Sequence, residues 1–179
     1  NHNYLKKVYE GAKPLFAVVR NEQGKSAVNS AQEFLIHRHL RPTPRVLLGM
    51  ALSLTRLASS AIDISDGCVA DLTHILERSQ CGAVIDLDKL PLSAELVSEF
   101  GLAQAEQYAL SGGEDYELCF TVPDSNKAKL DKALAHIGVN YTCIGQIRAI
   151  HPKNKNRIQF QRHGQRVEVE FAGGFDHFK

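Results

Sequence analysis

The sequence predicts an α/β fold, which can also be filed as α+β, in which one mixed sheet is layered with helices. Strand-like and helical segments alternate from residue 61 onward, and two alternating segments near the end have a hairpin pattern. The chain has 179 residues, of which 44% are hydrophobic, and this suits one domain with its own core. We therefore expect residues 1–179 to form a single domain.

The first third of the chain predicts two helices after a weakly patterned start. Residues 15–19 are strand-like and residues 21–25 resemble a turn. Ser30 and Glu33 form a capping-box pattern before an apolar run, so we expect a helix over residues 30–39 that Pro42 ends. Pro44 suits the first turn of a second helix, which should run toward Arg56.

The spacing of apolar residues predicts where the remaining helices and strands lie. The expected elements are a strand over 61–64, a helix over 69–79, a strand over 83–87, helices over 93–100 and 103–110, a strand over 116–122, a helix over 123–137 and a strand over 141–147. Residues 158–161 and 167–171 alternate around His163-Gly164-Gln165, which predicts an antiparallel hairpin.

Composition excludes several classes of protein. The formal net charge is +1, so no strong global field would recruit nucleic acid or an acidic membrane. The four cysteines lack metal-site spacing, and we expect them to be reduced. No segment is apolar over the roughly 20 residues that a membrane-spanning helix requires. The first residues do not show the charged and then apolar pattern of a secretion signal, so we expect a cytoplasmic protein.

The strand that ends at Ile64 carries the first group of candidate site residues. Strand alternation puts Asp63 and Ser65 on one face, with the flanking isoleucines buried on the other, and Asp66 stands at the start of the next helix. Carboxylates beside a helix amino terminus suit Mg²⁺ and phosphate, because free N–H groups there can face an anion. Helix capping by Ser65 or Asp66 is the simpler alternative, but it leaves Asp63 without a role.

The loop Ser111-Gly112-Gly113-Glu114-Asp115 is the second candidate, between a helix and a strand. Paired glycines allow a ligand to approach the backbone closely, although a helix-ending loop with solvated acids explains the pattern equally well. Phe175 follows two glycines near the end and would serve either as a stacking lid or as a core plug. The basic run around Arg38 lacks interleaved aromatic residues and suggests solvated surface.

Several segments together resemble the thiamine-monophosphate kinase family. They are His39-Leu40-Arg41-Pro42-Thr43-Pro44-Arg45, Ala61-Ile62-Asp63-Ile64-Ser65-Asp66-Gly67, Leu90-Pro91-Leu92-Ser93 and Ala109-Leu110-Ser111-Gly112-Gly113-Glu114-Asp115-Tyr116-Glu117-Leu118. The similarity runs in matching order from about residue 37 to the end. It implies a fold like the carboxy-terminal domain of aminoimidazole ribonucleotide synthetase and transfer of the ATP γ-phosphoryl group to thiamine monophosphate, giving the diphosphate.

The resemblance also implies roles for individual residues. Asp63 and Asp66 would ligate Mg²⁺, Ser65 would contact ATP, Glu114 would hold the thiamine portion, and Phe175 would stack on it. Phosphoryl transfer needs positioning and charge neutralisation more than a covalent nucleophile, so such roles agree with the chemistry.

The family's amino-terminal half, with its Gly-Asp-Asp and Thr-Thr-Asp motifs, is missing from the 179 residues. By the resemblance, that half supplies most of the ATP site and a homodimer interface, so we expect this chain alone to be inactive. Cys68 also stands where the family usually has leucine. Another synthetase of the same superfamily and a noncatalytic binding module are the remaining alternatives.

Overall fold

The computed structural model describes residues 3–8, 29–150 and 157–169, and for residues 3–8 it describes the backbone only. The strands are β1 Asn3–Val8, β2 Ser60–Ile64, β3 Gly82–Asp86, β4 Glu117–Pro123, β5 Thr142–Arg148, β6 Ile158–Arg162 and β7 Gln165–Val167. The helices are α1 Ser30–Leu40, α2 Val46–Thr55, α3 Cys68–Arg78, the 3-10 turn η1 Leu87–Lys89, α4 Ala94–Ser111 and α5 Asp124–His136.

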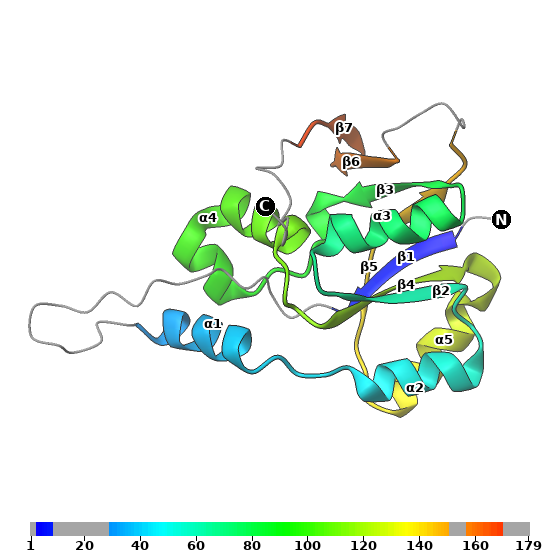
Figure 1. The fold of residues 1–179 in the computed structure, drawn as a ribbon, viewed down its shortest axis with the longest axis horizontal. Helices are drawn as coiled ribbons and strands as arrows, with labels where there is room; N and C mark the ends of the chain where they lie inside the picture. Colours follow the sequence, from blue (N-terminus) through cyan, green and yellow to red (C-terminus); the bar gives the residue numbers. More distant parts are fainter. Residues whose placement is uncertain (1–2, 9–28, 151–156, 170–179) are drawn as a thin grey trace, which may run out of the picture.

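All of these strands join one mixed sheet in the order β2-β4-β1-β5-β3-β6-β7 (Figure 1). Every pairing is antiparallel except that of β3 with β6, which is parallel. β2 is an edge strand, so one side of it faces away from the sheet. The mixed sheet layered with helices is therefore confirmed, and the carboxyl end of β2 lies where other groups can approach it.

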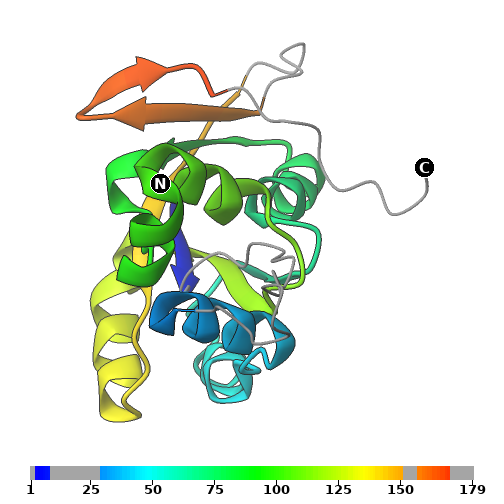
Figure 2. The same ribbon diagram turned by 90° about the vertical axis from the view of Figure 1, so that its left-hand side faces the viewer.

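Helices cover both faces of the sheet, as the side chains of β4 make clear. Cys119 lies in the core beneath α3 and α4, whereas its neighbour Phe120 lies in a second core with α2 and α5. Because successive strand residues point to opposite faces, the two cores are on opposite sides of β4. α1 packs against α4, and Figures 1 and 2 show α2 and α5 side by side at the lower edge of the molecule.

Most helices begin and end where their local signals predicted. α1 has a capping box in which Asn29, one residue before the predicted start, accepts a hydrogen bond from the Gln32 N–H at 2.8 Å. The two helices predicted over 93–100 and 103–110 form one element, α4, which is interrupted at Gly101 by a φ of 74°. The predicted break is therefore present as a glycine kink.

Three strand predictions need comment. β1 was not predicted, although it pairs with both β4 and β5 in the middle of the sheet. The hairpin is antiparallel, but the prediction of a second strand over 167–171 was wrong: β7 is Gln165–Val167, since positive φ angles at His163 and Gly164 make a two-residue turn. The predicted strand over 15–19 lies outside the described residues.

Candidate functional site

The candidate site begins at the end of β2, where the sheet edge turns into α3. Ile64 is fully buried, Ile62 is half-buried, and Asp63 is exposed. The exposed Asp63 carboxylate therefore carries no burial penalty. Among the described residues, its side chain has no ion pair or hydrogen bond, so its oxygens are available to a ligand.

The turn after β2 is organised around the carboxylate of Asp71, which lies in the first turn of α3. One oxygen, Oδ2, accepts hydrogen bonds from the backbone N–H groups of Ser65, Asp66 and Gly67 at 3.0, 3.1 and 3.2 Å. Asp71 is buried, and this burial raises the pKa of its carboxyl group even though the N–H groups oppose the shift. These three N–H groups are thus occupied within the chain. The helix amino terminus that was predicted to face an anion begins after them, at Cys68, and that expectation stays a prediction.

Asp71 was not among the residues predicted from the sequence. The sequence feature that could have identified it is its position, five residues after Asp66 and in the first turn of a helix that follows a glycine-containing turn. Because the turn's N–H groups all point at this carboxylate, the side chains of Ser65 and Asp66 are displayed from a braced loop. Asp71 is therefore a positioning residue for the turn.

The second predicted motif lies directly against this turn. The Glu114 N–H donates to the Ser65 carbonyl at 2.7 Å, and the Tyr116 N–H donates to the Ile64 carbonyl at 2.8 Å. A Cβ atom on Gly113 would lie 2.6 Å from the Ser65 carbonyl oxygen, which is closer than such atoms approach in proteins. The glycine is therefore required for the two turns to touch.

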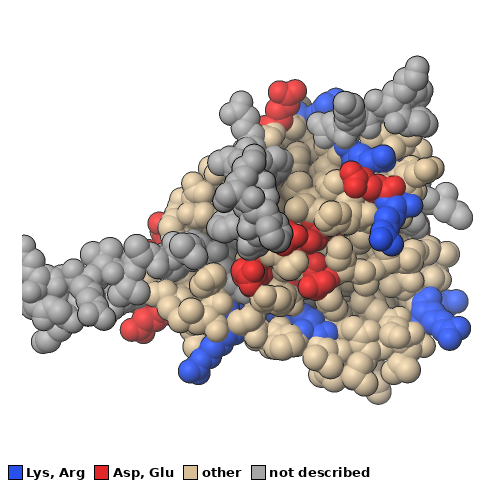
Figure 3. All heavy atoms as spheres, in the orientation of Figure 1, with Lys and Arg blue, Asp and Glu red and all other residues tan. Residues whose placement is uncertain are grey.

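The two turns bring their acidic side chains to one face of the molecule. Glu114 and Asp63 are exposed, Asp66 is half-exposed, and Figure 3 shows acidic side chains gathered at the centre of this face, over the end of β2 and the loop before β4. The Tyr116 hydroxyl donates to Glu114 Oε2 at 2.7 Å. That hydrogen bond, with a smaller electrostatic contribution from Asp63, raises the pKa of Tyr116, so both acids lie near this ring.

Two arginines adjoin the site, Arg38 from the last turn of α1 and Arg45 from the residue before α2. Arg45 donates from Nε and Nη2 to the two carboxylate oxygens of buried Glu117, each at 2.7 Å, and Arg38 Nη2 lies 3.6 Å from the same carboxylate. Arg38 is thus a partner of a buried acid, and the expectation of a solvated surface there was wrong. This paired geometry fastens the residue 41–45 segment beside the start of β4.

The oxygen-rich donor set suits a hard divalent cation. Ligand atoms of Asp66, Asp71 and His74 lie within 4.8 Å of one another, and Asp63 is a further exposed carboxylate in the preceding strand β2. Mg²⁺ prefers oxygen ligands and is usually held by one or two carboxylates together with substrate phosphates. Asp63 and Asp66 fit that arrangement, whereas Asp71 Oδ2 is already committed to three N–H groups. Phe175 lies outside the described residues.

Comparisons with known proteins find relatives in sequence and in structure. Residues 16–151 match the family described as AIR synthase related protein, C-terminal domain. A curated thiamine-monophosphate kinase from Haemophilus influenzae is 53% identical over 156 residues, which are 87% of this chain and 46% of the relative. The relative with the same name from Escherichia coli is 52% identical over 146 residues, which are 82% and 43% of the two chains.

Solved structures are also similar. The crystal structure of a thiamine-monophosphate kinase from Stenotrophomonas maltophilia matches with a TM-score of 0.70 and 29% identity, covering 92% of this chain and 51% of that one. A relative complexed with AMPPCP and TMP matches with a TM-score of 0.67 and 29% identity, covering 98% and 51%. The chain therefore spans about half the length of the relatives it matches. In the described part of the chain, no helix is long and apolar enough to cross a membrane.

Proposed function

The chain belongs to the family of AIR synthase related proteins, C-terminal domain, and we propose that it is the carboxy-terminal half of an enzyme that phosphorylates thiamine monophosphate with ATP. The names of the curated relatives support this reaction, as they are thiamine-monophosphate kinases at 53% and 52% identity. The solved relative with AMPPCP, an ATP analogue, and TMP supports both substrates. The complete protein would be a homodimer that assembles through the other half.

Each residue of the site has a proposed role, and the roles of the described residues are argued from their positions. Asp63 and Asp66 would hold Mg²⁺, which neutralises phosphate charge when it is bound. The Ser65 hydroxyl would contact the nucleotide from the braced turn. Glu114 is exposed and negatively charged, which suits the cationic thiazolium ring of thiamine, and Phe175 would stack on that ring.

The chemistry that these residues supply is positioning. In phosphoryl transfer most of the catalytic effect comes from holding the two substrates in line and compensating charge, with little covalent chemistry by the protein. Asp71 would orient Ser65 and Asp66 toward the nucleotide, and Tyr116 would orient Glu114 toward the acceptor substrate. No side chain in this half needs to act as a nucleophile.

The observation that carries the proposal is the hydrogen bond from the Glu114 N–H to the Ser65 carbonyl. It joins the turn proposed for the metal and nucleotide to the loop proposed for thiamine, and both substrates must be adjacent for direct transfer. Had the two motifs lain on opposite sides of the sheet, they could not have served one reaction.

The direct test is turnover of ATP with thiamine monophosphate by the full-length polypeptide, followed by chromatography of the thiamine phosphates. We expect thiamine diphosphate from the full-length protein and none from the 179-residue chain alone, which lacks the other half of its relatives. A full-length protein that consumes ATP only with a different acceptor would instead identify another synthetase of the superfamily. Binding without any ATP consumption would identify a noncatalytic module.

A further inference from the structure

Helix α2 is apolar on two sides, which is unusual for a helix at the edge of a molecule. Its sequence, VLLGMALSLT, has no charged residue. Leu48 and Leu52 are buried against the core that α2 shares with α5. On its other side lie four exposed apolar side chains, hereafter the α2 face: Val46 at 62%, Leu47 at 64%, Met50 at 54% and Leu54 at 80% exposure.

These four side chains form one continuous stripe. With about 100° of rotation per residue, positions 46, 47, 50 and 54 fall within an arc of roughly 100° on the helix. An apolar stripe of this width is the face that an amphipathic helix normally turns to a core. A helix with two such faces is normally buried between two layers, and the described part of the chain provides only one of them.

The neighbouring helix α5 shows what a solvent face looks like at this edge of the molecule. α5 packs against the same core through Leu130 and Leu134. Its outer side carries Lys129 and Lys132, which are exposed, and an ion pair between Lys127 and Asp131 at 2.8 Å. Charged residues are therefore not lacking in this region, and their absence from α2 is specific to that helix.

Two hollows border α2. One, at the start of the helix, is lined by Val46 and Leu47 of the α2 face together with Val139 and Tyr141 of the segment between α5 and β5. The other lies between Gly49, Leu52 and Ser53 of α2 and the edge strand β2, and it reaches Asp63. A body that covered α2 and extended over this second hollow would lie next to Asp63.

We propose that the α2 face is the docking surface for the other half of the full-length polypeptide. Relatives carry about as much chain again as this one, since the chain covers 46% of the Haemophilus influenzae relative and 51% of the Stenotrophomonas maltophilia structure. The hollow between α2 and β2 reaches Asp63, so a half-enzyme that covered α2 and this hollow would be placed to complete the nucleotide site. This last step rests on the proposed function, whereas the docking itself does not.

Hydrogen exchange measured by mass spectrometry tests the docking without any substrate. We expect amides of residues 46–55 to exchange at least 10-fold more slowly in the full-length protein than in the dilute 179-residue chain. Amides of α5, residues 124–136, should exchange alike in the two proteins and serve as the internal control. Equal exchange of α2 in both proteins would overturn the proposal.

Charge substitutions on α2 and on α5 distinguish three groups that could cover the α2 face: the other half of the polypeptide, a second copy of this chain, and the chain's own residues. Leu47→Glu with Met50→Glu should abolish the extra protection of α2 in the full-length protein and leave the melting temperature of the 179-residue chain unchanged. Ala128→Glu, on the exposed side of α5, should change neither. If the 179-residue chain dimerises and its α2 amides become protected with concentration, the occupant is a second copy and the proposal is wrong.

If the double substitution instead destabilises the dilute 179-residue chain, the chain's own residues cover the face, and the proposal is again wrong. A failure of the proposed function would give a different experimental result. A full-length protein with a protected α2 but no kinase activity would refute the reaction and leave the docking surface in place.

Discussion

Two strands of the sheet end in similar acidic sequences, yet the surroundings of their carboxylates differ. β2 leads into Ile62-Asp63-Ile64-Ser65-Asp66 and β3 into Ile85-Asp86-Leu87-Asp88-Lys89. After β2, the Asp63 side chain is exposed and forms no ion pair with a described residue. After β3, both carboxylates are engaged by other groups of the chain.

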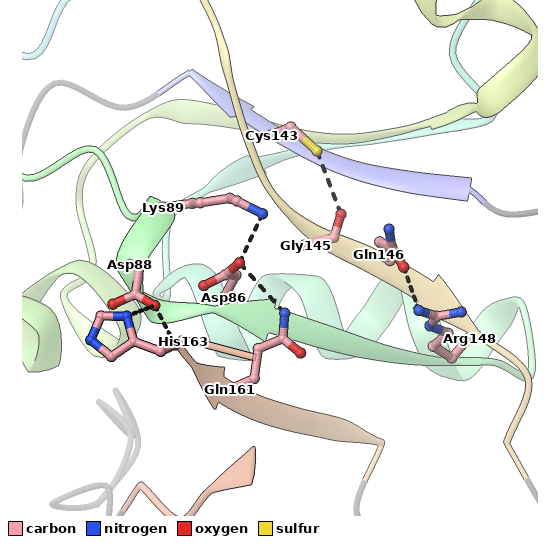
Figure 4. A network of polar contacts seen from close by, with 9 residues as sticks. All are labelled: Asp86, Asp88, Lys89, Cys143, Gly145, Gln146, Arg148, Gln161 and His163. Carbon is pink, nitrogen blue, oxygen red and sulfur yellow. Dashed lines mark hydrogen bonds and ion pairs between the residues drawn. The ribbon is translucent and has the colours of Figure 1, made fainter. Parts of the chain in front are cut away.

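The β3 carboxylates form part of a polar network that fastens the β6–β7 hairpin to the sheet (Figure 4). Lys89 Nζ lies 2.8 Å from Asp86 Oδ2, and Gln161 donates to the same oxygen at 3.4 Å. The backbone N–H of His163 donates to Asp88 at 2.6 Å. These acids therefore have a structural role that needs no external cation.

The difference teaches that an acidic motif at a strand end does not by itself define a ligand site. The two regions differ in how the chain treats these carboxylates. Lys89 and Gln161 supply a cation and a hydrogen-bond donor to Asp86, whereas no described residue forms an ion pair with Asp63. After β2, backbone N–H groups engage the carboxylate of Asp71, which shapes the turn, and the Asp63 side chain remains exposed. The assignment of Mg²⁺ to one region and not the other can be tested by substitution.

The largest effect is expected from Asp63→Asn in the full-length protein. Removing one carboxylate from the proposed metal site should lower kcat for phosphoryl transfer by roughly 100-fold or more, because charge compensation in the transition state is lost. The melting temperature should change little, since Asp63 is exposed. Steady-state kinetics and thermal denaturation give the two values.

Asp86→Asn is the matched variant at the other strand end. It should lower the free energy of unfolding by about 1 kcal/mol through its weakened contacts with Lys89 and Gln161, with kcat nearly unchanged. If the two variants had the opposite pattern, the functional distinction between the two strand ends would be wrong.

Asp71→Asn should have the next largest effect. The neutral amide oxygen accepts weaker hydrogen bonds from the three N–H groups, so the turn that displays Ser65 and Asp66 loosens. We expect the concentration of Mg²⁺ needed for half-maximal activity to rise about 10–100-fold, as is typical when a residue supporting metal ligands is changed.

Glu77→Gln, on the exposed side of the same helix, is the control for Asp71→Asn and should leave the Mg²⁺ requirement as it was. His74→Ala distinguishes positioning from direct ligation. If His74→Ala raised the Mg²⁺ requirement as much as Asp71→Asn, the cluster of Asp66, Asp71 and His74 would itself be the metal site.

Gly113→Ala tests the contact between the two motif turns. The added Cβ would meet the Ser65 carbonyl oxygen at 2.6 Å and push the loop away from the turn. Since small displacements of a substrate-holding group have large costs, KM for thiamine monophosphate should rise roughly 10-fold. Gly49→Ala, whose Cβ would meet only Leu118 at 3.8 Å, should leave KM unchanged, and a Gly113→Ala enzyme with normal KM would separate the loop from the acceptor site.

The smallest effect is expected from Lys89→Met. Burial tends to raise the pKa of Asp86, but the hydrogen bond and charge of Lys89 outweigh it and bring that pKa below its ordinary value of 3.8. The pair therefore stabilises the fold above that pH, and the contribution is lost as the pH falls through the lowered pKa. Because Lys89 is 60% exposed, solvent screening limits the loss on substitution to about 0.5 kcal/mol at pH 7.

Guanidinium denaturation of Lys89→Met and the unsubstituted chain between pH 7 and pH 3 gives the comparison. The difference between them should shrink toward the acid end, as Asp86 begins to bind a proton. A difference that stays constant down to pH 3 would show that the lost stability comes from the packing of the Lys89 stem and not from its charge.

Local sequence signals predicted most of the fold within about two residues, but not the pairing of distant strands. α1 follows a local capping box, and α3 and α5 follow apolar periods that lie within the helices themselves. β1 has the sequence NYLKKV, with little alternation, and its place between β4 and β5 depends on residues more than 100 positions away. The parallel pairing of β6 with β3 is likewise non-local and has no signature in either strand.

For the candidate site, the sequence identified the two motifs but not what holds them together. Asp63, Asp66 and Glu114 were predicted as site residues, and the hydrogen bond from the Glu114 N–H to the Ser65 carbonyl brings the two motif turns together. Asp71 could not be recognised because its role is defined by three backbone N–H groups, and acidic residues are common in first helical turns for other reasons.

The central claim is that the turn after β2 holds a divalent cation and that the similar turn after β3 does not. Its most direct test is NMR of the isotope-labelled full-length protein with AMPPCP and substoichiometric Mn²⁺ as a paramagnetic substitute for Mg²⁺. The account predicts that amide signals of residues 63–67 and 111–116 broaden first, while those of residues 86–89 remain sharp. Broadening centred on residues 86–89, or none at residues 63–67, would contradict it.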